Sequence, residues 1–151
     1  MALPTRAFRG DIVVMVNWSG TGSTYTNFCG ATGGTLTVSN EIRTEQVGDC
    51  DDWTAPIQTL KKPGAQNWTM SIDGTWAAQN NKQVIDWAVD QTLLPVRIHF
   101  VNAPTGDYEY LDGNAYLSGL DIAGIGNITG DAVTRSIQIE FDGSPELTVA
   151  T

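Results

Sequence analysis

The last third of the chain alternates apolar and polar side chains with a period of two residues. The alternation is loose from Tyr108 to Ile122 and regular from Ala132 to Asp142. Successive side chains of a strand point to opposite faces of a sheet, so this pattern predicts two long strands, each with one buried face and one presented face. Few reactive side chains lie along these strands. We therefore expect another protein, rather than a substrate, to lie against the presented face.

Further strands are predicted upstream, and only one segment has a convincing helical period. The predicted strands cover residues 11–17, 36–43, 68–76 and 95–101. In the helix, from Asn80 to Gln91, the residues Val84, Trp87 and Ala88 form an apolar stripe that should pack on a sheet. This order predicts a mainly β protein, an antiparallel β-sandwich or barrel flanked by one α-helix. At 151 residues the chain is expected to be a single domain, 1–151.

Residues 45–67 show neither the strand period nor the helix period, and they predict a long loop. Loops longer than about 12–15 residues are uncommon inside compact domains and are frequently functional. This one carries three large apolar side chains, those of Trp53, Ile57 and Leu60. Such side chains either fold back on the core or contact a neighbouring molecule.

The charge and the apolar runs of the chain oppose two functions, binding to nucleic acid and association with a membrane. A formal net charge of −9 opposes nucleic-acid binding, because affinity for phosphates depends on Lys and Arg. The first ten residues lack an apolar run of signal-peptide length, and no segment approaches the length of a membrane span. We expect no association with a membrane, and synthesis and assembly in the cytoplasm.

No residue pattern predicts catalysis, a metal site or a cofactor site. His99 is the single histidine and has no evident orienting partner, so a surface or interface role is favoured. Cys29 and Cys50 lack the spacing of a zinc site; a disulfide between them is possible, but free thiols are favoured in a reducing compartment. The acidic run around Asp49 and Asp52 lacks the spacing of a calcium loop and is interpreted as a solvated turn.

Two other functions stay open at this point. Five tryptophans are compatible with a carbohydrate-binding β-sandwich module, although Trp68, Trp76 and Trp87 are in phase with apolar neighbours and only Trp18 and Trp53 lie in loop-like segments. Acidic residues are also plentiful enough to supply the paired carboxylates of a small hydrolase.

Taken in order, the segments resemble the major tail tube proteins of long-tailed bacteriophages and of related gene transfer agents. The resemblance covers most of the chain. It rests on the following segments: Gly34–Glu41 leading to Asp49–Trp53, Gly64–Trp76, the helix Gln79–Gln91, Leu111–Leu120 and Val133–Thr148. One difference lies near the C-terminus: this chain has the sequence Gly143-Ser-Pro-Glu-Leu147, where such proteins often have a second glycine before the final strand.

The resemblance implies a non-enzymatic virion protein without cofactors. Six copies would form a ring, and stacked rings would form a tail tube that conducts DNA without binding it specifically. Residues 45–67, with Trp53, Ile57 and Leu60, would contact the next ring. The expected partners are other copies of the chain, the tape measure protein, the tail terminator and the distal tail or baseplate proteins.

A channel for DNA should be lined by neutral or acidic side chains, because a negative wall lets a polyanion pass without being held. Asp73, Glu109 and Glu140 are the candidates, each placed on a predicted strand beside apolar neighbours. Arg135 lies on one of these strands as well, and we expect it either to interrupt the acidic lining or to pair with a carboxylate of an adjacent subunit.

Overall fold

The computed structural model describes residues 11–28, 31–76, 81–126 and 128–151. In these ranges the chain forms eight β-strands and one α-helix. They are, in chain order, β1 (Ile12–Val16), β2 (Thr26–Asn27), β3 (Ala31–Val47), β4 (Gln58–Thr75), α1 (Asn81–Asp90), β5 (Leu94–Phe100), β6 (Tyr108–Ala123), β7 (Thr134–Phe141) and β8 (Glu146–Val149).

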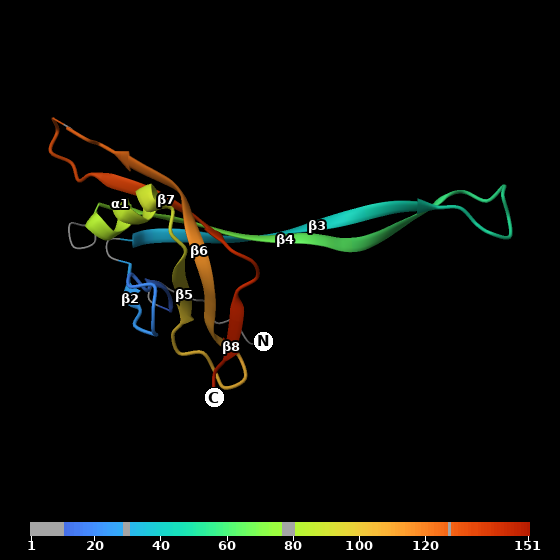
Figure 1. Cartoon of the computed structure of the whole chain (residues 1–151), viewed down its shortest axis with the longest axis horizontal. Helices are drawn as coiled ribbons and strands as arrows, with labels where there is room; N and C mark the ends of the chain where they lie inside the picture. The colour runs from blue at the N-terminus through green and yellow to red at the C-terminus, as the bar shows by residue number, and fades with distance from the viewer. Residues whose placement is uncertain (1–10, 29–30, 77–80, 127) are drawn as a thin grey trace, which may run out of the picture.

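All eight strands belong to one antiparallel sheet. Its order is β2-β1-β5-β6-β7-β4-β3, and β8 pairs with β6 beside this path. Strand β6 joins the two halves of the sheet, because its first part pairs with β5 and β8 and its second part pairs with β7. In Figure 1 the long strands β3 and β4 run across the picture, whereas β5 and β8 run along its height. The predicted mainly β antiparallel fold with one helix is confirmed, although the sheet remains open at β2 and β3.

The bent sheet encloses one apolar core. Apolar side chains from the concave sides of β1, β4, β5, β6 and β7 meet there. The members with almost no exposed surface are Val16, Ile72, Val84, Trp87, Val96, Ile98, Ala115, Ile137 and Ile139. On β4 and β7 these residues alternate with polar ones, so one face of each strand is buried and the other is presented, as the sequence predicts.

Helix α1 closes the core. Val84 and Trp87 are its buried residues and pack in the same cluster as the sheet residues. The Trp87 indole Nε1 donates a hydrogen bond to the Thr92 carbonyl oxygen at 2.8 Å, which anchors the chain just after the helix. The next residue after the helix, Gln91, has a φ of 54°, a left-handed conformation typical of helix C-termini. The predicted helix is confirmed, and its predicted first residue, Asn80, lies outside the described residues.

The predicted long loop over residues 45–67 is wrong in its extent. Residues 45–47 belong to β3 and residues 58–67 belong to β4, so that the connection between them covers only residues 48–57. Pro63 is tolerated inside β4 because this part of the strand pairs only with β3, and a register shift lies beside it. What the sequence presents as a loop is the outer half of a long β-hairpin.

Two other sequence-based expectations are affected by the described ranges. Cys29 lies outside them, so a disulfide between Cys29 and Cys50 stays untested; the Cys50 side chain is exposed. In the described part of the chain, no helix is long and apolar enough to cross a membrane.

Candidate functional site: hairpin and polar sheet face

The β3–β4 hairpin extends far beyond the rest of the molecule, as Figure 1 shows at its right-hand side. Strand β4 pairs with β7 only over residues 69–75, so residues 41–66 have no strand partner outside the hairpin. We call residues 41–66 the distal hairpin. An isolated two-stranded hairpin is marginally stable in water, and further contacts are needed to hold it in one conformation.

The distal hairpin exposes its apolar side chains. Trp53 is 93% exposed, Ile57 64% and Leu60 54%. Ile42 and Val47 are exposed as well. The three residues selected from the sequence therefore do not fold back on the core of their own chain. Several large exposed apolar side chains on one segment are typical of a protein–protein contact.

The acidic turn at the tip of the hairpin uses its carboxylates to hold its own backbone. The Asp49 carboxylate accepts hydrogen bonds from the backbone N–H groups of Asp51 (2.8 Å) and Asp52 (3.3 Å). The Asp52 carboxylate accepts hydrogen bonds from the Thr54 hydroxyl (2.6 Å) and from the Thr54 backbone N–H (3.0 Å). These donors lower the pKa of Asp52. Among the described residues, no group of three potential ligands is arranged to hold a metal ion.

The second feature is the polar face of the sheet, on the side opposite the core. Neighbouring strands place hydroxyl and amide side chains in register here, and the pairs Thr69 with Glu140 and Ser71 with Gln138 show the alignment. We define the polar face by these residues: Thr35, Thr37, Thr69, Ser71, Asp73, Thr75, Ser118, Asp121, Thr134, Ser136, Gln138 and Glu140. This set contains three acidic residues and neither Lys nor Arg. A polyanion such as DNA would find no basic side chain to bind on this surface.

The structure brings two of the three predicted lining residues onto this face. Asp73 pairs with Ser136, and Glu140 pairs with Thr69, four residues from Asp73 along β4, which is roughly 13 Å. Asp121 is a third acid on the polar face, opposite Ser136 on the other side of β7, and sequence reasoning missed it. Its position between Leu120 and Ile122, which both face inward, is the signal that could have found it.

Glu109 lies apart from them, at the beginning of β6, where the pairing with β8 has a register shift. Its carboxylate is 3.7 Å from Nε2 of His99. The structure therefore groups Asp73 with Glu140 but not with Glu109.

Arg135 does not belong to the polar face. It is only 3% exposed, and its guanidinium lies over the Phe28 ring at 4.5 Å from the centroid. The expectation that it interrupts a channel lining is wrong, because Arg135 shares the face of Ile137 and Ile139.

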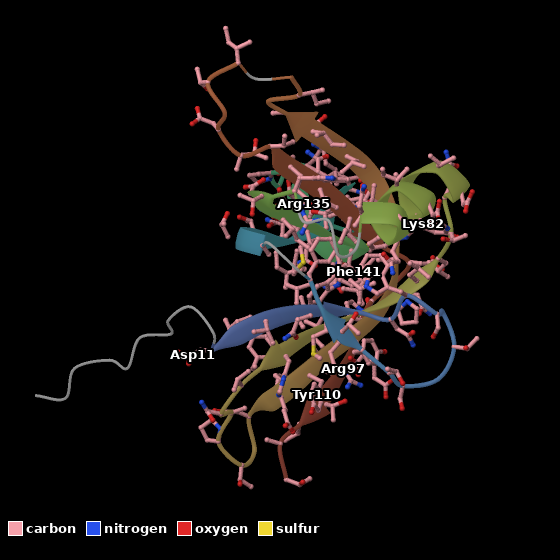
Figure 2. All side chains as sticks on the ribbon, turned by 90° about the vertical axis from the view of Figure 1, so that its left-hand side faces the viewer. Asp11, Lys82, Arg97, Tyr110, Arg135 and Phe141 are labelled. Atoms are coloured by element: carbon pink, nitrogen blue, oxygen red, sulfur yellow. The ribbon has the colours of Figure 1, made fainter. Side chains whose placement is uncertain are left out.

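Arg97 is the centre of a compact polar cluster on β5 and β6. Its guanidinium is stacked between the rings of Tyr25 (4.1 Å) and Tyr110 (4.3 Å), and Figure 2 shows Arg97 and Tyr110 side by side. Nε donates to Asp112 Oδ1 at 2.6 Å and Nη2 to Oδ2 at 3.2 Å. The Asp112 hydrogen bond raises the pKa of Arg97, and burial, followed by the Asp112 charge, raises the pKa of Tyr25. The cluster holds the Tyr25 segment on the sheet.

Replacing Arg97 by lysine should lower the free energy of unfolding by about 1–2 kcal/mol, because lysine keeps the charge but loses the bidentate pair and the stacking. Urea unfolding measures the change. The matched control is Lys82→Gln, which breaks the exposed Lys82–Asp86 pair on α1 and should cost much less, because an exposed ion pair contributes little to stability. Equal costs for the two variants would contradict a stabilising role of the cluster.

The tryptophans do not form an exposed platform in the described part of the chain. Trp87 is buried, and Trp18, Trp68 and Trp76 are partly buried against the core. Trp18 contacts Trp87 edge to face, with 5.9 Å between ring centroids. Trp53 is the exposed one, at the tip of the hairpin.

The exposed apolar side chains of the distal hairpin mark a surface for contacts with other proteins. The sequence profile of the phage tail tube protein family matches residues 9–147. The chain belongs to this family. It is a structural component of a phage-type virion tail and not an enzyme, so the hydrolase interpretation does not apply.

Solved structures with the same fold agree with this assignment. The tail of an empty gene transfer agent particle, with C6 symmetry, is 14% identical and has a TM-score of 0.71; the match covers 95% of this chain and 100% of that one. The SPP1 tail tube is 15% identical with a TM-score of 0.61, over 96% and 81% of the two chains. The sheath–tube complex of the PVC extracellular contractile injection system is 12% identical with a TM-score of 0.60, over 96% and 93%. No curated protein is significantly similar in sequence.

Proposed function

We propose that six copies of this chain form a ring and that the rings stack into a tail tube with a central channel for DNA. The observation that carries the proposal is the distal hairpin, which exposes Trp53, Ile57 and Leu60 and has no strand partner in its own chain. A contact with the next ring covers these side chains. The C6 symmetry of the similar gene transfer agent tail supports a six-membered ring.

Ring closure also accounts for the open edges of the sheet. β2 and β3 end the strand path, and β8 pairs only with β6. Unpaired edges promote uncontrolled association unless they are covered. A head-to-tail contact repeated around a rotation axis closes into a ring and gives every edge a neighbour.

The polar face lines the channel in this proposal. It carries hydroxyl groups and the carboxylates of Asp73, Asp121 and Glu140 without a cation, so DNA phosphates meet no fixed binding partner and the nucleic acid passes without specific binding. Glu109 remains a separate candidate for the lining, at the other end of β6.

Lysine at Asp73 and Glu140 should slow DNA ejection from particles that carry the variant. The substituted side chains would supply cations to DNA phosphates, and each phosphate contact adds about one unit to the slope of log affinity against log salt concentration. Ejection rates measured at several salt concentrations should therefore recover as salt rises. Glu109→Lys is tested separately: slower ejection in this variant would indicate that Glu109 also lines the channel.

The control for the lysine variants is Asp90→Lys, at the end of α1 on the opposite side of the sheet. It makes a carboxylate-to-lysine change away from the polar face and should leave ejection unchanged. Normal ejection with lysine at both Asp73 and Glu140, in particles that assemble, would contradict the assignment of the polar face to the channel.

The proposed partners follow from the place of such a tube in a virion. Besides other copies of itself, the chain contacts a tail terminator at one end, distal tail or baseplate proteins at the other, and the tape measure protein inside. Similar folds occur in the tube terminating cap and the baseplate of the anti-feeding prophage, and in the PVC sheath/tube terminator. The virion belongs to a phage or a gene transfer agent, and assembly takes place in the cytoplasm of the host.

Sedimentation velocity over a wide range of protein concentration tests the proposed self-assembly. The expected result is a hexamer and longer particles built from it. A monomer at every concentration would overturn the proposal.

A further inference from the structure

A groove of about 390 Å³ lies where β1 and the beginning of β3, from opposite ends of the strand path, approach each other. We call it the seam groove. It reaches the core, because Phe28 and Ile72 belong both to its lining and to the core cluster. Ile12, Val14 and Ala31 add further apolar surface to the lining. A groove of this volume is large enough for a few side chains of a partner.

Both walls of the seam groove offer backbone groups to an added strand. β2 pairs with β1 only at Met15 and Val16, and β3 pairs only with β4. In the described part of the chain, Ile12 on the side away from β5, and the outer edge of β3, therefore have no ladder partner. An extended segment can form main-chain hydrogen bonds at such an edge and place alternate side chains in pockets.

Gly33, which lines the seam groove, is a glycine that its own chain does not require. No atom lies within 4 Å of a Cβ built at this position, and its φ is not positive. Its neighbour Gly34 does have an internal reason, since an added Cβ would lie 3.3 Å from the Ser71 carbonyl oxygen. A strand glycine without such a reason lowers stability, and it often marks the close approach of another backbone.

The first ten residues of the chain, which lie outside the described structure, differ from the rest in charge. They contain Arg6 and Arg9 and no Asp or Glu, so all 17 acidic residues of the chain follow them. They also contain two large apolar residues, Leu3 and Phe8. Such a segment is attracted to the acidic remainder of another copy and has an aromatic anchor for an apolar pocket. Ten extended residues span roughly 33 Å, which is long enough to cross from one copy to the next.

The direction in which the chain enters β1 favours a groove on another copy. The Asp11 carbonyl oxygen accepts a hydrogen bond from the Val101 backbone N–H at 2.7 Å, so Asp11 already lies alongside the end of β5. To reach the seam groove of their own chain, residues 1–10 would have to reverse direction within a residue or two of Asp11. The same segment of a second copy has no such restriction.

We propose that residues 1–10 of one copy bind in the seam groove of a second copy, with Phe8 among the apolar lining residues and the backbone passing Gly33. Arg6 and Arg9 strengthen the contact through the negative charge of that copy. This inference rests on the proposed self-assembly, and it adds a contact separate from the distal hairpin. Most of the segment also precedes residues 9–147, the part that the family profile matches.

Photochemical coupling in assembled tubes tests the contact directly. Phe8→p-benzoylphenylalanine keeps an aromatic side chain and couples on illumination to the groups that it touches. In tubes built from mixed light and heavy isotope-labelled chains, mass spectrometry should find position 8 joined to β1, Phe28 or the start of β3 of another chain. The same substitution at Val89, exposed on α1, is the matched control and should not label the groove. Coupling of position 8 within its own chain, or outside the groove, would overturn the proposal.

The protein concentration needed for tube formation, measured by pelleting, gives a second readout. Phe8→Ser should raise this threshold about tenfold or more, because a large apolar side chain no longer fills the groove. Gly33→Val should raise it as well, because its side chain obstructs the approach of the segment. The monomer should stay folded, which circular dichroism checks, since its own chain leaves space for the added Cβ. Val89→Ser is the control and should leave the threshold unchanged.

The arginines have a separate test. Arg6→Gln/Arg9→Gln should raise the threshold at 0.1 M NaCl but not at 1 M, where the screening length falls to about 3 Å. An unchanged threshold for Phe8→Ser, whatever Gly33→Val does, would overturn this inference and leave the proposed function standing. Failure of the unmodified chain to assemble would overturn both.

Discussion

Replacing Trp53, Ile57 and Leu60 together by serine will abolish tube formation and leave the monomer folded. The three side chains are 93%, 64% and 54% exposed, so the isolated chain loses little packing when they are removed. In an assembled tube, each large apolar side chain contributes about 1.5–3 kcal/mol when fully buried. The combined loss for three side chains exceeds about 4 kcal/mol, which lowers an association constant by more than about a thousandfold. Pelleting measures assembly, and circular dichroism checks the fold.

The control for this triple variant is Val89→Ser, which removes another exposed apolar side chain, 73% exposed on α1. It should assemble as the unmodified chain does. Normal tubes from the triple variant would show that the distal hairpin does not make the ring-stacking contact.

Trp87→Ala should lower the free energy of unfolding by about 3–5 kcal/mol. The side chain is 1% exposed, packs edge to face on Trp18 and donates a hydrogen bond to the Thr92 carbonyl. Its removal leaves a large cavity between α1 and the sheet. A domain with the usual total of about 5–15 kcal/mol becomes marginal after such a loss, which urea unfolding measures.

The same substitution at a second tryptophan provides the control for Trp87→Ala. Trp53→Ala deletes an identical side chain at the exposed tip of the hairpin and should change the stability of the monomer by less than about 0.5 kcal/mol. Similar losses for the two variants would mean that α1 is not held to the sheet by Trp87.

The sequence predicts those elements that have one face on the core. Val84 and Trp87 recur at helical spacing because one side of α1 is buried, and Met70 and Ile72 alternate with Ser71 and Asp73 because β4 has a buried side there. In both cases the core imposes the period. The face of Asp73 and Glu140 follows from the same alternation.

The distal hairpin could not be predicted in this way. Between Glu45 and Val47, and from Gln58 to Asn67, both faces of the strands are exposed, so no core imposes alternation. Pro63 and Gly64 also weaken a strand prediction. This segment forms strands because the backbones of β3 and β4 pair with each other. Such pairing does not require apolar and polar side chains to alternate, so the sequence shows no strand period here.

Glu109 and Arg135 show two other limits of sequence reasoning. The register shift in the β6–β8 pairing beside Glu109 is a local irregularity without a signature in the sequence. Arg135 is in phase with Ile137 and Ile139, and this phase is the signal that assigns it to the core face; buried arginines are rare, so the residue type alone favours the surface.

Electron microscopy of the purified protein at high concentration tests the central claim most directly. We expect end-on views of rings with six-fold symmetry and a central pore, and side views of tubes in which each distal hairpin reaches the next ring. Particles without a pore, or a population that stays monomeric at every concentration, would contradict the account.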